Sequence, residues 1–143
     1  MIFTALEGMS QMVMDKFKKW VTRDAGKVNL ILDRNTLVPG EKITGVFHLK
    51  GPKNRKKVSR LECDLMQVDP NSRAEKMVEV ATTIYMAKVI DDENWTKVPF
   101  SYSLPDQLAN YNPEASYRFR TRLIFTNNVQ SIDHDEIQLK IEP

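Results

Sequence analysis

Apolar and polar residues alternate with a period of two over most of this chain, from just after Gly26 to its end. Strands with one buried face show this alternation, because successive side chains point to opposite faces of a sheet. Turn-forming residues such as Pro39-Gly40 and Asn127-Asn128 separate the alternating runs. An all-β fold follows, an antiparallel β-sandwich of about seven strands. The runs cover residues 27–33, 42–49, 60–65, 78–89, 98–104, 117–123 and 136–141.

Residues 1–25 repeat differently, with apolar residues three or four positions apart, which predicts one N-terminal amphipathic α-helix. Gly26 is a stop signal for this helix. We therefore divide the chain into the helix, 1–25, and a β-sandwich domain, 26–143. The apolar stripe is a candidate partner-binding surface, and it includes Met9, Val13, Phe17 and Trp20. It could pack on the sandwich or on a second copy of the chain, bind a protein partner, or contact a membrane.

Residues that carry catalytic or metal chemistry are few. The 143 residues contain one cysteine, Cys63, and two histidines, His48 and His134. These are too few for a disulfide within the chain or for a cysteine and histidine zinc site. Cys63 shares its predicted strand face with buried leucines, so we expect a small buried hydrophobe. We therefore predict a protein that is not an enzyme and that uses no metal or cofactor.

Targeting signals also constrain the chain. Apolar residues stand where a secretory signal needs a positive start, and no apolar run reaches the length of a membrane span. A single cysteine also fits a reducing compartment, so we expect a cytoplasmic location. The net charge is only +2, too small for a general nucleic-acid binder.

A basic run falls in a predicted hairpin loop between the second and third strands. Lys53, Arg55, Lys56 and Lys57 belong to this run, which contains no acid. It could bind phosphate, anionic lipid or an acidic partner, or it could be a solvated loop. Interleaved aromatic residues are missing from the run, so base stacking with a nucleic acid is not expected.

Three arginines, Arg118, Arg120 and Arg122, occupy alternate positions of one predicted strand. They project from the same face, because the period of a strand is two. The stripe could bind an acidic ligand through bidentate contacts. Alternatively, it pairs with carboxylates of neighbouring strands such as Glu62, Asp64 or Glu79.

Four polar residues, 133–136, precede the last predicted strand. Oxygen ligands in this segment could hold a hard cation, but their spacing fits no calcium loop. Because aspartate favours turns, we predict a turn at Asp133–Glu136.

Three segments resemble, in order, motifs of one family. They are Thr36–Val46 with its Pro39-Gly40-Glu41 turn and small Gly45, Val98–Pro105, and Asp133–Pro143. Together they resemble the N-terminal domain of the bacterial sporulation-control family, stage-zero sporulation protein M and its relatives. The resemblance covers residues 28–143. It implies an arrestin-like, immunoglobulin-like sandwich in a cytoplasmic protein with regulatory and interaction roles, and it carries over no catalytic residues.

The family usually has a second sandwich domain beyond the position of Pro143. We expect the N-terminal helix to cover an apolar face that such a domain would meet, in its own chain or in a neighbour's. The predicted function is a non-enzymatic regulatory protein that binds a protein partner or itself, as a homo-oligomer, through exposed strand edges and the helix. The alternative is a peripheral membrane or anionic-ligand adaptor that uses the helix and the Lys53–Lys57 loop.

Overall fold

Eight β-strands in two sheets make up the part of the chain that the computed structural model describes, residues 26–108 and 110–141. No helix occurs within those ranges. The strands are β1 (Lys27–Leu32), β2 (Thr36–Leu37), β3 (Lys42–Lys50), β4 (Val58–Val68), β5 (Glu75–Lys88), β6 (Thr96–Ser103), β7 (Ser116–Phe125) and β8 (Gln130–Leu139).

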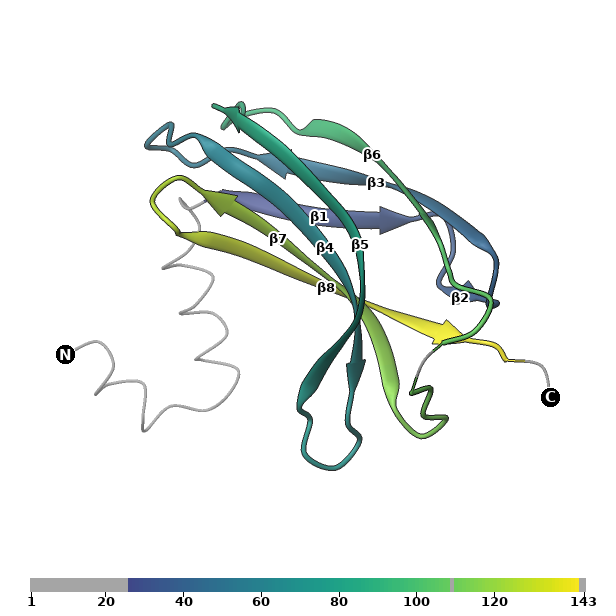
Figure 1. Cartoon of the computed structure of the whole chain (residues 1–143). Coiled ribbons are helices and arrows are strands. Elements are labelled where there is room, and N and C mark those ends of the chain that lie inside the picture. The colour runs from purple at the N-terminus through teal and green to yellow at the C-terminus, as the bar shows by residue number, and fades with distance from the viewer. Residues whose placement is uncertain (1–25, 109, 142–143) are drawn as a thin grey trace.

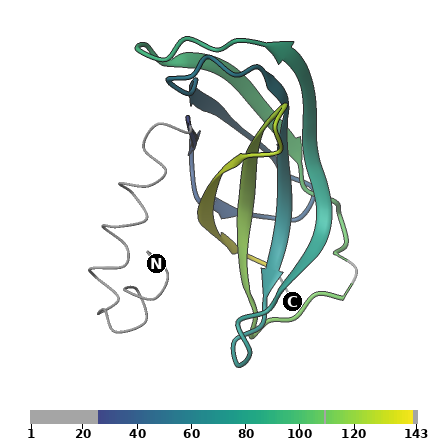
Figure 2. The same cartoon turned by 90° about the vertical axis from the view of Figure 1, so that its left-hand side faces the viewer.

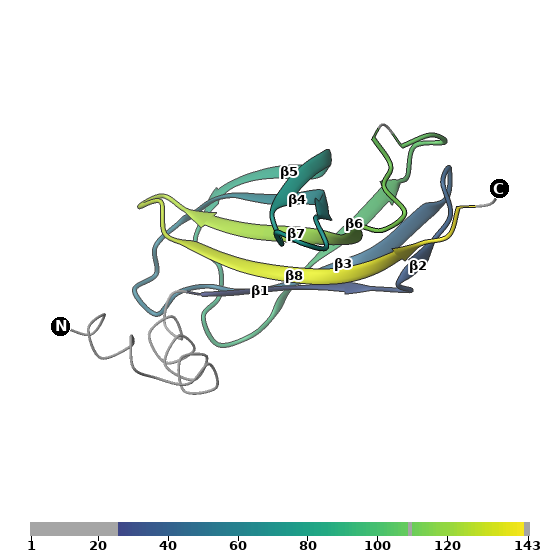
Figure 3. The ribbon, with the colours of Figure 1, turned by 90° about the horizontal axis from the view of Figure 1, so that it is seen from below.

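The two sheets differ in size. The smaller has the order β1-β3-β6, and the larger has the order β2-β8-β7-β4-β5 (Figures 1 and 3). All neighbouring strands are antiparallel except β2, which pairs with β8 in parallel. The β4–β5 hairpin projects beyond the other strands (Figures 1 and 2). The larger sheet therefore has β5 as one edge, and the smaller sheet has β1 and β6 as its edges.

One apolar core lies between the sheets, and aromatic rings join its two halves. Phe100 of β6 meets Phe119 of β7 edge to face, with ring centroids 5.5 Å apart. Phe47 and Tyr102 extend this cluster from the smaller sheet, at 5.2 Å from Phe100 and 5.7 Å from Phe119. Edge-to-face contacts of this kind add to the stabilisation that burial provides. The alternation in the sequence thus places one apolar side of each sheet in a common core.

Gly45 lies where β1 passes close to β3. A Cβ atom at this position would lie 2.5 Å from the backbone oxygen of Ile31 and 3.2 Å from the Cα of Leu32. The backbones of β1 and β3 thus come close together at this position. Only glycine fits without moving β1.

Replacing Gly45 with alanine should therefore destabilise the domain. We expect a loss of about 1–3 kcal/mol in the free energy of unfolding, because the new methyl group meets backbone atoms that cannot rotate away. Urea unfolding measures this loss. Ser101→Ala, an exposed change on β6, is the control and should alter stability by less than about 0.5 kcal/mol. Equal stability of both variants would contradict the close approach.

To the about seven predicted strands the fold adds β2, which sequence alternation could not reveal because it has only two residues. One prediction about strands is wrong. The turn predicted at Asp133–Glu136 is instead the middle of β8. Here the alternation continues with charged residues: Asp133 and Asp135 are partly buried, whereas His134 and Glu136 are exposed.

The basic loop also differs from its prediction. It joins β3 of the smaller sheet to β4 of the larger sheet, so it is a crossover and not a hairpin. The predicted N-terminal helix, with its candidate contacts Met9, Val13, Phe17 and Trp20, lies outside the described residues. Within those residues, no helix is long and apolar enough to cross a membrane.

Candidate functional site

A ladder of paired charges covers the outer face of the larger sheet. Its cations are the predicted stripe on β7, Arg118, Arg120 and Arg122, which alternates with buried Tyr117, Phe119 and Thr121. Its anions come from the neighbouring strands β4 and β8 and from Glu75 of β5. Glu62 and Asp64 of β4 lie opposite Arg122 and Arg120, and Glu136 of β8 lies opposite Arg118.

Each arginine of the ladder contacts two carboxylates. Arg122 Nη2 lies 2.5 Å from Glu62 and 3.4 Å from Asp64. Arg120 bridges Asp64 at 3.4 Å and Glu75 at 3.1 Å. Arg118 pairs with Glu75 and reaches Glu136 at 3.7 Å.

Of the two alternatives for the arginine stripe, the structure shows the second: the arginines pair with carboxylates of neighbouring strands in the same sheet. Glu62 and Asp64 were expected partners, whereas Glu79 was expected and forms no ion pair among the described residues.

Asp64 is the most deeply placed charge of this ladder. Its side chain is only 3% exposed, although it belongs to the outer face. The arginine stems cover it, because long charged side chains bury their alkyl portions along a surface. Partial burial acts to raise the pKa of Glu75, but the hydrogen bond and charge of Arg118 outweigh it, so this pKa lies below its ordinary value. Because Asp64 and Glu75 are each shared by two arginines, removing one carboxylate affects more than one ion pair of the ladder.

Replacing Asp64 with asparagine should destabilise the domain by about 2–3 kcal/mol, because two partly buried guanidinium groups lose their shared anion. Glu136→Gln is the matched control. Its carboxylate is 62% exposed and lies 3.7 Å from Arg118, so we expect a loss below about 0.5 kcal/mol. Urea unfolding at neutral pH compares the two. A cost for Asp64→Asn no larger than that of the control would show that the ladder does not support the sheet.

The β5 edge is the second feature of this sheet. β5 is 14 residues long and hydrogen-bonds to β4 on one side only. Three of its side chains are large, apolar and exposed: Met77 at 46%, Val80 at 51% and Tyr85 at 80%. Exposed edges with apolar side chains are where an extended segment can add a strand.

Other edges of the fold are less open. On β1, the Leu30 N–H donates to Asp133 Oδ2 at 2.9 Å, so a side chain already occupies this edge. Pro99 interrupts β6, because proline offers no N–H. β2 has only two residues. Of the four strands that end the two sheets, β1, β2, β5 and β6, β5 is the longest, has exposed apolar side chains and contains no proline.

Irregular pairing limits how much of β5 a partner could use. The register with β4 shifts between Cys63 and Asp64 and again between Leu65 and Met66. These shifts explain why Val80 is exposed while Ala81 packs against the core, although simple alternation groups Val80 with Val78 and Ile84. The longest stretch with regular register is Thr82–Tyr85.

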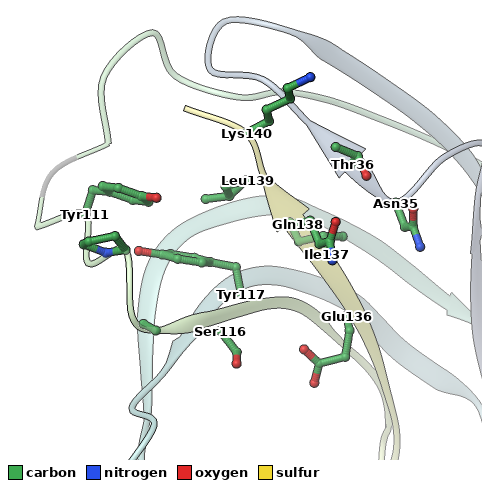
Figure 4. Close-up of a pocket in the computed structure, with 12 residues that line it drawn as sticks. Asn35, Thr36, Tyr111, Ser116, Tyr117, Glu136, Ile137, Gln138, Leu139 and Lys140 are labelled. Carbon is green, nitrogen blue, oxygen red and sulfur yellow. The ribbon is translucent and has the colours of Figure 1, made fainter. Parts of the chain in front are cut away.

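A pocket of about 590 Å³ lies at the opposite edge of the larger sheet, where β2 meets β8 (Figure 4). Tyr111 lines it and stacks on Tyr117, with ring centroids 5.9 Å apart. The Tyr117 hydroxyl accepts hydrogen bonds from Gln67 Nε2 and from the Asn112 N–H, which ties the loop before β7 to the sheet. Glu136 and Lys140 are the charged residues of the lining. The pocket offers a rigid aromatic surface beside polar groups.

Two inward carboxyl groups of β8 form a further cluster. Burial raises the pKa of Asp135 to about 8, aided by a hydrogen bond to Asp133 and by the charge of Asp133. Asp135 Oδ2 is buried and has no hydrogen-bond partner within the described residues. Asp133 meanwhile accepts the Leu30 N–H, so this pair links β8 to β1.

Protonation of Asp135 predicts a dependence of stability on pH. The folded chain holds a proton that the unfolded chain releases near pH 4, so stability should fall as pH rises from about 4 to about 8. Asp135→Asn should flatten this fall and stabilise the protein at pH 8 by about 1–2 kcal/mol, a value discounted for solvent screening. Urea titrations across this range measure it, with the exposed change Asp106→Asn as control. An unchanged pH profile would show that Asp135 is ionised at neutral pH.

Lys53, Arg55, Lys56 and Lys57 are exposed on the β3–β4 crossover and form no ion pair within the described residues. The structure does not join them to the arginine ladder.

Cys63 is fully buried, and burial raises the pKa of its thiol to about 12. Sequence reasoning missed Tyr85 and Trp95. Tyr85 follows inward Ile84, so alternation could have placed it on the outer face, and Trp95 lies at the end of the polar turn Asp91–Asn94.

Within the described residues, the geometry defines an all-β domain of two facing sheets, with a paired charge ladder on the larger sheet and a long open edge at β5. A family model described as SpoOM protein, Spo0M, matches residues 14–143, so the chain belongs to this family.

Solved structures show the same fold. Spo0M, the sporulation control protein from Bacillus subtilis, is similar with a TM-score of 0.65 and 22% identity over 83% of this chain and 51% of that one. This chain therefore spans about half of the Bacillus protein. The superoxide reductase (neelaredoxin) from Ignicoccus hospitalis is similar in fold alone, with a TM-score of 0.53 and 8% identity over 88% of this chain and 92% of that one. No curated protein sequence matches.

Proposed function

We propose that this chain is a non-enzymatic, arrestin-like interaction domain with a regulatory role in the cytoplasm, and that it binds a protein partner by strand addition at β5. The observation that carries the proposal is the open β5 edge with its exposed Met77, Val80 and Tyr85. Membership of a family with a sporulation-control protein supports a regulatory role.

Strand addition fits β5 on two grounds. Main-chain hydrogen bonds to the edge supply affinity without demanding a particular sequence, and the side chains that flank them supply specificity. Tyr85, at 80% exposed, provides a large apolar surface with one polar end, as interface anchors often do. A partner segment opposite Thr82–Tyr85 would therefore be short, extended and apolar on the side that meets Tyr85.

The charge ladder supports this mode of binding. Its arginines already pair with carboxylates of the same sheet, so they offer few donors to an acidic ligand. They instead hold β4 and β7 in a fixed arrangement next to β5. A rigid edge loses less conformational entropy when a partner binds, which favours strand addition.

A second copy of the chain is one possible partner, since two β5 edges could pair antiparallel. Such a contact is isologous and closes as a two-fold dimer. In that case the oligomeric state depends on the same residues as partner binding.

Charged substitutions on β5 test the proposal. Val80→Lys and Tyr85→Lys place lysines where a pairing strand would lie, a device that protects natural edges. A photo-crosslinking residue at Thr83 of the intact chain should attach to one discrete polypeptide, or to a second copy, and each lysine variant should reduce the yield at least tenfold. Ile132→Lys is the matched control, because Ile132 is 52% exposed on the same sheet but lies on β8.

Two results would contradict strand addition at β5. One is crosslinking that persists unchanged in Val80→Lys and Tyr85→Lys. The other is an equal loss in Ile132→Lys, because this would indicate a general effect of added charge.

A further inference from the structure

An exposed indole ring lies among lysines on the outer face of the smaller sheet. The Lys50 ammonium lies 4.7 Å from the centre of the Trp95 ring, and His48 lies beside the same ring at 6.0 Å. Trp95 is 44% exposed. The cation–π contact fixes the ring against β3 while leaving much of it open to solvent.

Pairing register adds two lysines to this face. Lys27 of β1 lies opposite Lys50, and Lys97 of β6 lies opposite His48. Partners in an antiparallel pair share a face, and the neighbouring Phe47 and Leu49 are buried, so these lysines point away from the core. The other aromatic side chains of these three strands lie in the core.

The basic crossover meets the same end of the domain. Gly51 donates its N–H to the backbone carbonyl oxygen of Asp91 at 2.8 Å, which brings the β3–β4 loop beside the loop that carries Trp95. We define the basic end by the residues that share this location: Lys27, Lys50, Lys53, Arg55, Lys56, Lys57, Lys97 and Trp95.

The charges of the basic end form no close ion pair among the described residues, in contrast to the arginine ladder. The N–H groups of Glu93 and Asn94 lower the pKa of Asp91, and Arg55 is near enough for its charge to help. Three acids lie nearby, Asp91, Asp92 and Glu93. Asp91 is occupied by the N–H groups of Glu93 and Asn94. Seven cations against three acids leave a positive surface around a fixed, exposed tryptophan.

We propose that the basic end binds the surface of a membrane that contains anionic phospholipids. Lysines are attracted to the negative headgroups, and tryptophan favours the boundary between headgroups and acyl chains. A nucleic acid fits less well, because sheet faces that bind one commonly present several stacking aromatics and this face presents one. This binding is separate from strand addition at β5, which belongs to the other sheet.

Vesicles of phosphatidylcholine with and without phosphatidylserine test the proposal on the intact chain. In a Trp20→Phe background, Trp95 is the remaining tryptophan and reports directly. Its emission should shift to shorter wavelength only with phosphatidylserine present, because the ring leaves water. Raising the salt concentration should reverse the shift, since exposed charges are screened.

Charge removal gives the quantitative test. Each lysine near an anionic surface contributes about fivefold in affinity, so Lys53→Gln, Lys56→Gln and Lys57→Gln together should weaken vesicle binding about a hundredfold in co-sedimentation. The matched control carries Lys42→Gln, Lys76→Gln and Lys140→Gln, which give the same net charge away from the basic end. This control should bind nearly as well as the wild type.

Several results would overturn the proposal. Binding that is indifferent to phosphatidylserine, or an equal loss in both triple variants, would exclude a site at the basic end. Unchanged vesicle binding without an emission shift of Trp95 would assign the membrane contact to residues 1–25 instead. Binding of duplex DNA that is lost in the first variant, with no vesicle binding, would assign the basic end to nucleic acid.

Discussion

The contact between Phe100 of β6 and Phe119 of β7 fixes which side of each sheet is inside. Once these rings meet edge to face, the period of two decides the direction of the other side chains on both strands. The outward positions of β7 become arginines, and the outward positions of β3 include His48 and Lys50. The surfaces through which the domain can act are therefore consequences of how its aromatic core is packed.

The two outer faces treat positive charge differently. On the larger sheet, the arginines are partly buried and each meets carboxylates, so their charge stabilises the sheet. On the smaller sheet and the adjoining crossover, most lysines are exposed, and none forms an ion pair among the described residues. The paired arginines hold strands of the larger sheet together, whereas the unpaired charges of the basic end can attract a partner of opposite charge. The edge strand β5 and the basic end can thus act independently.

Much of the fold follows from the sequence, because one-sided burial leaves a readable alternation. Seven of the eight strands overlap predicted runs, and Glu62 and Asp64 were expected partners of the arginines. Other features depend on contacts distant in sequence. The partly buried Asp133 accepts the Leu30 N–H of another strand, and Trp95 is held beside Lys50. Glu75 replaces Glu79 in the ladder because β5 is irregular. Local pattern cannot supply such information.

Residue-resolved hydrogen exchange of the intact, unliganded chain tests most directly whether β5 is an open edge. Amides of β4 and β7 lie between two neighbouring strands and should exchange slowly. Within Thr82–Tyr85, amides directed at β4 should be protected, and the alternate amides directed outward should exchange far faster. Uniform protection of all four would show that the edge is already covered, and it would contradict the account given for this domain.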